Sequence, residues 1–211
     1  MTQRNFGLWE KTMADTPESY KEWFEMEKRY LRKNIKSRTD VLEVGCGDGR
    51  SLSYLENKQL LLVGIDNDSS AVELARKNFQ GNSPPSFFMY GDGKNIPFKR
   101  PRFDYVLSMT TPANFGKDRN KFYSEMQRVL RDNGEIILSV YNEDAFEERM
   151  KLYKKLGVPK ENVFGTTVIF NDLISEQFSQ SQLEKIFKEN NLTPIEISKQ
   201  GLGYFCRLEK R

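Results

Sequence analysis

The stretch Val-Leu-Glu-Val-Gly-Cys-Gly-Asp-Gly at residues 41–49 decides the fold of this chain. Four mostly apolar residues lead directly into a turn that carries glycine at positions 45, 47 and 49. This pattern predicts a strand that ends in a tight turn before a helix. Glycine permits positive φ and has no Cβ to hold a ligand away, so the turn can bring bare backbone against a ligand. We therefore expect a ligand site where this strand ends.

Short apolar runs alternate with longer amphipathic stretches beyond this point. The expected strands are 41–44, 60–65, 87–90, 105–109 and 134–141, and the expected helices between them are about 48–57, 69–80 and 118–132. Strands that alternate with crossover helices predict an α/β fold with a doubly wound, mostly parallel sheet. Ser69 or Ser70 is the expected N-cap of the helix at 69–80.

The last third of the chain departs from this alternation. The expected elements are a helix at 143–156, an inserted hairpin at about 163–178 that turns at 171–172, a helix to Asn190 capped by Ser179 or Ser181, and β-like runs at 193–199 and 203–208 on either side of Gly201. The two final runs predict a C-terminal antiparallel hairpin, which would add an antiparallel strand to the sheet.

The length of 211 residues suits one domain, which we place at 1–211. Within it, 38–211 is the expected Rossmann-like core and 1–37 an N-terminal helical segment, with Pro17 suited to the first helical turn. An aromatic-rich stripe follows, made of Tyr20, Trp23, Phe24, Tyr30, Leu31 and Ile35. Two interpretations are open: the stripe packs on the sheet as core, or the segment is a lid over a ligand.

Composition excludes several classes of function. The chain has no histidine, which removes the commonest metal ligand and every Ser-His or Cys-His dyad. Its net charge of +3 is too small to argue for a nucleic-acid ligand, although it does not exclude tRNA. No apolar run is long enough to span a bilayer and no signal peptide is evident, so we expect a cytoplasmic protein without a membrane partner. With only Cys46 and Cys206, reduced thiols are expected.

Carboxylates recur at the ends of the predicted strands. Glu43 precedes the glycine turn, and a buried carboxylate there is costly without a partner. Asp66 ends the second strand, where its carboxylate can accept both hydrogen bonds of a ribose diol. Asp92 follows the third strand, between Gly91 and Gly93. A dinucleotide-binding loop would need a small residue at position 50, where this chain has Arg50, and Asp48 would repel a pyrophosphate.

Residues 41–49 resemble the first motif of the class I, Rossmann-like methyltransferases, which use S-adenosylmethionine as cofactor. Asp66, the 91–98 segment, the 103–109 strand and the 128–138 run resemble the family's later motifs, in the same order. The resemblance implies a seven-stranded sheet and a metal-free methyl transfer. The expected cofactor site is made of Glu43, Gly45, Cys46, Gly47, Gly49, Asp66, Asn67, Gly91, Asp92, Gly93 and Met109. Trp9 is a further candidate for this site, because aromatic faces attract a cation such as the sulfonium.

The methyl acceptor should bind beyond the carboxyl ends of the strands. Thr111, Asn114 and Tyr141 follow the fourth and fifth strands and are our candidates to contact it. The loop lacks the Asn-Pro-Pro-Tyr signature of the family's amino-methylating members, which argues against methylation of an exocyclic base amine. We expect a small-molecule acceptor. The alternatives are a tRNA or protein methyltransferase, a non-catalytic S-adenosylmethionine-binding protein and a nicotinamide-dependent oxidoreductase.

Overall fold

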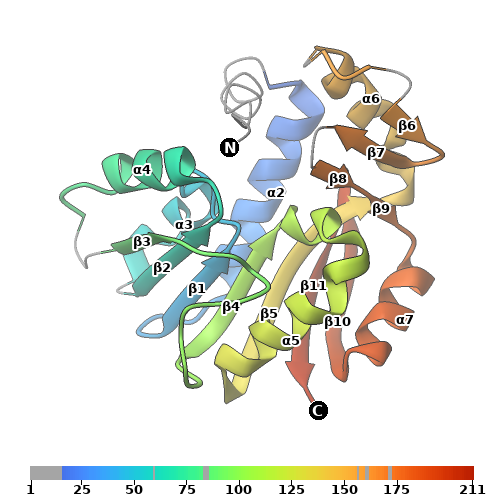
Figure 1. The fold of residues 1–211 in the computed structure, drawn as a ribbon. Coiled ribbons are helices and arrows are strands. Elements are labelled where there is room, and N and C mark those ends of the chain that lie inside the picture. The colour runs from blue at the N-terminus through green and yellow to red at the C-terminus, as the bar shows by residue number, and fades with distance from the viewer. Residues whose placement is uncertain (1–15, 59, 83–85, 156, 160–161, 171–172) are drawn as a thin grey trace.

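A computed structural model describes residues 16–58, 60–82, 86–155, 157–159, 162–170 and 173–211. Its centre is a mixed sheet with the strand order β3-β2-β1-β4-β5-β11-β10, and the two-residue β9 also pairs with β5 (Figure 1). The strands are β1 (Asp40–Val44), β2 (Leu61–Asp66), β3 (Ser86–Tyr90), β4 (Phe103–Met109), β5 (Leu130–Asn142), β9 (Gln177–Phe178), β10 (Leu192–Gln200) and β11 (Gly203–Lys210). This confirms the predicted doubly wound, mostly parallel sheet of seven main strands.

The direction of each strand follows from how it is connected. The strands β1 to β5 are parallel to one another, because a crossover element returns the chain to the same edge between them. β11 runs antiparallel to both β5 and β10, so β10 and β11 form the predicted closing hairpin. All the parallel strands therefore bring their carboxyl ends to one edge of the sheet.

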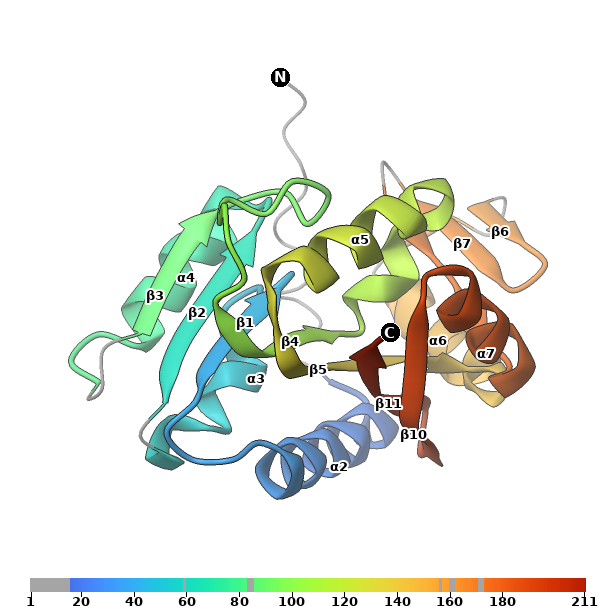
Figure 2. The same cartoon turned by 90° about the horizontal axis from the view of Figure 1, so that it is seen from below.

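Helices cover both faces of the sheet. They are α2 (Glu18–Asn34), α3 (Arg50–Ser53), α4 (Ser69–Asn78), α5 (Arg119–Val129), α6 (Phe146–Lys155) and α7 (Gln180–Glu189). Figure 2 shows α2 on one face and α5 on the other. The aromatic stripe of α2 is buried: Trp23 packs on Tyr141 of β5, and Tyr30 stacks on Phe205 of β11 at 5.0 Å between ring centroids. The stripe is thus core, whereas residues 1–15 lie outside the described part of the chain.

Three predicted boundaries were wrong for local reasons. The helix expected at 48–57 is only α3 plus a 3₁₀ turn at Glu56–Lys58. It cannot begin before Arg50, because Gly49 has a φ of +86° and is not helical. The helix expected to reach 132 ends at Val129, since Leu130 is already paired with Phe103 in the sheet. The N-cap of α4 is Asp68, whose side chain accepts hydrogen bonds from the backbone N–H of Ser70 and of Ala71.

The segment expected as a hairpin at about 163–178 contains more than two strands. β6 (Val163–Phe164), β7 (Thr167–Phe170) and β8 (Leu173–Ser175) form a small three-stranded antiparallel sheet, which β9 follows. The expected turn at 171–172 lies outside the described residues. The helix expected at 143–156 is the 3₁₀ turn Glu143–Ala145 followed by α6. Ser179 caps α7 as predicted, in a capping box with Gln182.

Candidate functional site

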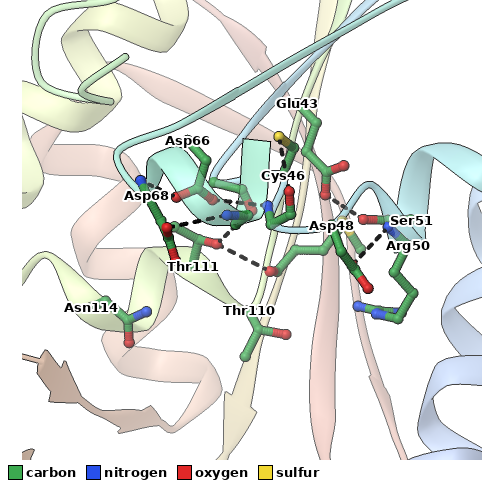
Figure 3. Close-up of a pocket in the computed structure, with 14 residues that line it drawn as sticks. Glu43, Cys46, Asp48, Arg50, Ser51, Asp66, Asp68, Thr110, Thr111 and Asn114 are labelled. Atoms are coloured by element: carbon green, nitrogen blue, oxygen red, sulfur yellow. Dashed lines mark hydrogen bonds between the residues drawn. The ribbon is translucent and has the colours of Figure 1, made fainter. Parts of the chain in front are cut away.

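A pocket opens at the carboxyl ends of the parallel strands β1, β2 and β4, where the strand order of the sheet reverses (Figure 3). Its lining residues are Glu43, Gly45, Cys46, Gly47, Asp48, Arg50, Ser51, Asp66, Asp68, Ala71, Met109, Thr110, Thr111 and Asn114. The glycine turn therefore lies at the ligand-binding edge that is usual for open α/β sheets.

The glycine turn is shaped by its backbone. Gly45, Gly47 and Gly49 have φ values of +78°, +54° and +86°, a region that side chains with a Cβ rarely adopt. The backbone N–H groups of Gly45 and Cys46 both donate to the carbonyl oxygen of Ile65, which holds the turn against β2. A Cβ on Gly45 would lie 2.4 Å from Thr111 Cγ2. The glycine thus lets the turn and the loop after β4 meet at the floor of the pocket.

Glu43 places a buried carboxyl group at the pocket. It is 1% exposed and accepts a hydrogen bond from the Ser51 hydroxyl at Oε1. Its other oxygen, Oε2, is buried and has no hydrogen-bond partner among the described residues. Burial raises the pKa of Glu43 to about 8, against the lowering effects of Ser51 and Arg50. An unpaired buried carboxyl oxygen in a pocket wall is a site that a cationic group would satisfy.

Asp66 is oriented by two backbone donors. Its Oδ2 accepts from Gly47 N at 2.8 Å and its Oδ1 from Asp68 N at 2.9 Å. Burial raises the pKa of the Asp66 carboxyl, while those two N–H groups lower it. A carboxylate has about four acceptor positions, so each oxygen keeps one for a ligand hydroxyl. The geometry therefore suits a diol between the glycine turn and α4.

The loop after β4 forms the opposite wall. Thr110 has a φ of +66°, an uncommon backbone conformation for a residue with a branched side chain. Its N–H donates to Ser139 Oγ at 2.9 Å, which ties the loop to β5. The Thr111 hydroxyl is 3.3 Å from the carbonyl oxygens of both Gly45 and Met109. Asn114 is exposed at the pocket, and its amide makes no hydrogen bond with another described residue.

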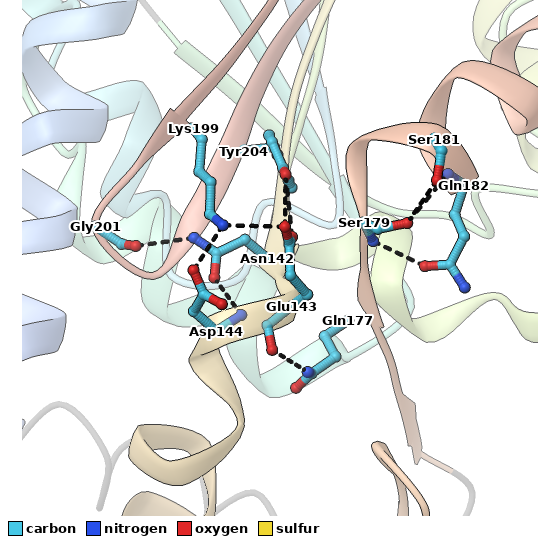
Figure 4. Close-up of polar contacts among 10 residues, drawn as sticks. All are labelled: Asn142, Glu143, Asp144, Gln177, Ser179, Ser181, Gln182, Lys199, Gly201 and Tyr204. Atoms are coloured by element: carbon cyan, nitrogen blue, oxygen red, sulfur yellow. Dashed lines mark hydrogen bonds and ion pairs between the residues drawn. The ribbon is translucent and has the colours of Figure 1, made fainter.

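The end of β5 is more enclosed than expected. Tyr141 is 6% exposed, packs against Trp23 and does not line the pocket. Burial raises the pKa of its phenol well above the ordinary value, so it stays protonated near neutral pH. The Glu143 carboxylate accepts hydrogen bonds from Lys199 Nζ at 3.0 Å and from the Tyr204 hydroxyl (Figure 4). These contacts connect the C-terminal hairpin to the turn after β5.

The structure brings together eight of the predicted site residues: Glu43, Gly45, Cys46, Gly47, Asp66, Met109, Thr111 and Asn114 line the pocket. Gly49, Asn67, Gly91, Asp92, Gly93 and Tyr141 do not line it, and Trp9 lies outside the described residues. Asp92 is exposed and accepts a hydrogen bond from Lys94 N at 2.8 Å. The segment still lies close to Asp66, because the neighbouring Gly91 N–H donates to the Asp66 carbonyl oxygen.

Six lining residues were absent from the predicted site: Asp48, Arg50, Ser51, Asp68, Ala71 and Thr110. A signal exists for most of them. Asp48, Arg50 and Ser51 directly continue the glycine turn, and Asp68 and Ala71 begin the helix after Asp66. The first turns of helices that follow parallel strands face the carboxyl edge of the sheet, so these positions could have been included.

No cluster of three or more His, Cys, Asp or Glu side chains suited to a metal ion occurs within the described ranges. None of the helices that the structure describes combines the length and apolar character needed to cross a membrane. Cys46 and Cys206 are both buried free cysteines.

Comparison with known sequences gives two findings. A family model described as "Methyltransferase domain" matches residues 41–134. A fatty-acid O-methyltransferase of Mycolicibacterium smegmatis is 33% identical over 96 residues, which cover 44% of this chain and 34% of that protein. The chain spans less than two thirds of the length of the first curated relatives that it matches.

Comparison with solved structures extends over most of the chain. The PH0226 protein of Pyrococcus horikoshii has a TM-score of 0.74 at 22% identity, with 93% of each chain covered. A Thermotoga maritima protein described as an SAM-dependent methyltransferase, possible histamine N-methyltransferase, has a TM-score of 0.69 at 18% identity and covers 99% of this chain and 97% of its own. At these identities the likeness concerns the fold.

Proposed function

We propose that this chain is a class I methyltransferase that binds S-adenosylmethionine in the glycine-lined pocket and methylates a small-molecule acceptor without a metal ion. The observation that carries the proposal is the buried, unpartnered Oε2 of Glu43 in the pocket wall. The cofactor brings an ammonium group that such an oxygen would accept, together with a ribose diol suited to Asp66.

The chemical groups that line the pocket suit this cofactor. The glycine turn leaves room for a ligand against bare backbone, and Glu43 and Asp66 offer acceptors at separate points around it. When bound, the cofactor supplies a methyl group already activated by a sulfonium. The task left to the protein is to hold an acceptor atom in line with that methyl and to keep water away.

Acceptor contacts are proposed for the loop after β4 and the end of β5. Asn114 lines the pocket with an amide that makes no hydrogen bond within the described part of the chain, and Thr110 and Thr111 form the adjoining wall. Tyr141 would contribute packing, because its raised pKa makes it a poor base at neutral pH. An acceptor atom that is already deprotonated, such as a carboxylate oxygen or the nitrogen of a neutral amine, would need no base to become a nucleophile. The residues at the loop after β4 would then only have to hold that atom in line with the methyl group of the cofactor.

Two observations favour a small acceptor over tRNA or a protein. The relative and the neighbour named above carry names that refer to a fatty acid and to histamine. In addition, two cations near the loop after β4 are neutralised: Arg119 pairs with Glu176, and Lys94 pairs with Asp118 at 3.1 Å. A surface for a polyanion would leave such groups free.

The test is methyl transfer from S-adenosylmethionine labelled in its methyl group. We would offer the purified chain a panel of small carboxylic acids and amines and, separately, bulk tRNA, with S-adenosylhomocysteine measured as the common product. Label in a small molecule supports the proposal. Label in tRNA would replace it with the alternative, and binding of the cofactor without product from any acceptor class would favour a non-catalytic binding protein.

A further inference from the structure

The pocket contains one positive side chain among several carboxylates. Glu43, Asp48, Asp66 and Asp68 line it, and Arg50 is the only cation among its described lining residues. Arg50 adjoins Ser51, whose hydroxyl is bonded to Glu43, so the cation and the buried carboxyl group lie at the same end of the pocket (Figure 3). The amino-acid end of the proposed cofactor carries both an ammonium and a carboxylate. It therefore needs an acceptor and a donor side by side.

The guanidinium of Arg50 is held firmly from one side. Its Nη1 donates to Glu27 Oε1 at 2.6 Å and to the Tyr54 hydroxyl at 2.7 Å, and its Cζ lies 4.0 Å from the centroid of the Phe24 ring. By contrast, Nε and Nη2 make no hydrogen bond with another described residue. These two atoms present parallel N–H groups, the arrangement with which arginine binds a carboxylate through both oxygens.

Glu27 connects Arg50 to the opposite wall of the pocket. Its side chain is fully buried, although it does not line the pocket. Its second oxygen, Oε2, faces the Ser139 hydroxyl at 3.4 Å, and Ser139 Oγ in turn accepts the N–H of Thr110. A carboxylate in that position is expensive unless it is paired. Glu27 therefore fixes the guanidinium of α3 with respect to β5 and the loop after β4.

We propose that Arg50 binds the carboxylate of the cofactor's amino-acid end, and that Glu27 is the positioning residue that aims its guanidinium. The inference rests on the proposed function, because it assumes that the ligand is S-adenosylmethionine. It assigns the two charges of one ligand group to two neighbouring residues: the ammonium to Glu43 and the carboxylate to Arg50. It also explains why α2 places the buried side chain of Glu27 behind the pocket, although Glu27 lies 23 positions away from Arg50 in the sequence.

The test compares two ligands by calorimetric titration. S-adenosylhomocysteine has the amino-acid end, whereas 5′-methylthioadenosine keeps the nucleoside and lacks that end. We expect Arg50→Gln to weaken S-adenosylhomocysteine binding on the order of 10- to 100-fold. The affinity for methylthioadenosine should change by less than about 2-fold. Glu27→Gln should shift the ratio of the two affinities in the same direction, since the guanidinium loses its anchor.

The control is Glu25→Gln, on the same helix, where the carboxylate is exposed and pairs with Lys28. It should change neither affinity. If Glu27→Gln does not fold, the double variant Glu27→Gln/Arg50→Gln removes both charges of the buried pair, and it should show the Arg50→Gln pattern. Equal losses for both ligands, or no loss for either, would overturn the assignment of Arg50. A wild-type chain that binds neither ligand would overturn the proposed function itself.

Discussion

At the scale of single residues, the cofactor proposal depends most on Glu43. Its carboxyl group combines complete burial, one hydroxyl donor and one unpartnered oxygen. Burial raises its pKa to about 8, whereas in the unfolded chain a glutamate titrates near its ordinary value. The folded protein therefore binds a proton at neutral pH that the unfolded chain has lost. Two consequences can be measured, one for stability and one for binding.

The first concerns stability without ligand. Because the pKa of Glu43 is raised on folding, its contribution is fully present below the unfolded pKa and is lost as the pH rises towards about 8. Relative to Glu43→Gln, the free energy of unfolding of the wild type should fall by up to about 1.4 kcal/mol per pH unit in that window. Urea unfolding at pH 5, 6, 7 and 8 measures this. Parallel pH profiles of the two proteins would contradict the raised pKa.

The second consequence concerns binding. A cationic ammonium beside Glu43 favours its ionised form, so binding of S-adenosylmethionine at pH 7 should release a proton. Calorimetry in two buffers of different ionisation enthalpy counts that proton. Glu43→Gln should bind more weakly and release none. Proton release that persists in the variant would place the titrating group elsewhere.

Asp66 provides an independent check on the nucleoside end of the pocket. Asp66→Ala should weaken S-adenosylmethionine binding by about 1 to 3 kcal/mol, because ribose hydroxyls would lose their charged partner. Its carboxylate also holds Gly47 N and Asp68 N, so circular dichroism should first show that the variant is folded. Glu73→Ala is the matched control, since it removes an exposed carboxylate of α4 that does not line the pocket. Equal affinity for wild type and a folded Asp66→Ala would remove Asp66 from the site.

Some of these residues could be predicted from the sequence and others could not. Glu43, Gly45 and Asp66 occupy fixed positions relative to strand ends, so local pattern was sufficient to select them. Glu27 could not be predicted from the sequence, because its role depends on a contact with Arg50, which is 23 positions away in the chain. Tyr141 lies at the expected strand end, but its burial depends on α2 packing over it.

At the scale of elements, the insertion formed by β6, β7 and β8 is held by one buried arginine. Arg149 of α6 is 0% exposed; its Nη1 donates to Thr166 O at 3.0 Å and to Gln177 Oε1 at 2.6 Å, and its Nη2 donates to Ser175 O at 2.8 Å. Thr166 and Ser175 belong to the insertion, and Gln177 belongs to β9, which follows it. The hydrogen bonds of Arg149 therefore hold the insertion against α6.

We predict that Arg149→Met destabilises the protein by about 2 to 5 kcal/mol, because several buried acceptors would lose their donor. Urea unfolding measures the difference. Lys154→Met, an exposed position on the same helix, is the control and should change stability by less than about 0.5 kcal/mol. An Arg149→Met protein as stable as the control variant would show that the insertion does not need this residue.

Element boundaries were harder to predict than element types. Periodicity selected the five strands β1 to β5, because their buried runs contrast with amphipathic neighbours. The end of α5 was placed too late because Leu130 suits either a helix or a strand, and only its pairing with Phe103 decides between them. The sequence predicted only a hairpin where the insertion forms a three-stranded sheet. Its strands are two to four residues long, which is too short to show an alternation of apolar and polar residues.

At the scale of the whole molecule, the strand order explains where the pocket lies. β1 has β2 on one side and β4 on the other, so the connections after β1 and after β4 leave the sheet in opposite directions. A hollow opens between them at the carboxyl edge, which is the usual ligand position in open α/β sheets. Glu43, Asp66 and Met109 come from the ends of those three strands. Topology thus brings into one pocket residues that the sequence separates.

The measurement that tests the central claim most directly is calorimetric titration of the purified chain with S-adenosylmethionine, with NAD and NADP titrated in parallel. We predict saturable, one-site binding of S-adenosylmethionine and no binding of either nicotinamide cofactor, because Asp48 and Arg50 replace the features of a pyrophosphate-binding loop. Binding of NAD or NADP alone would contradict the proposal and make the pocket that of an oxidoreductase. Binding of none of the three would contradict the assignment of Glu43 and Asp66 to a cofactor.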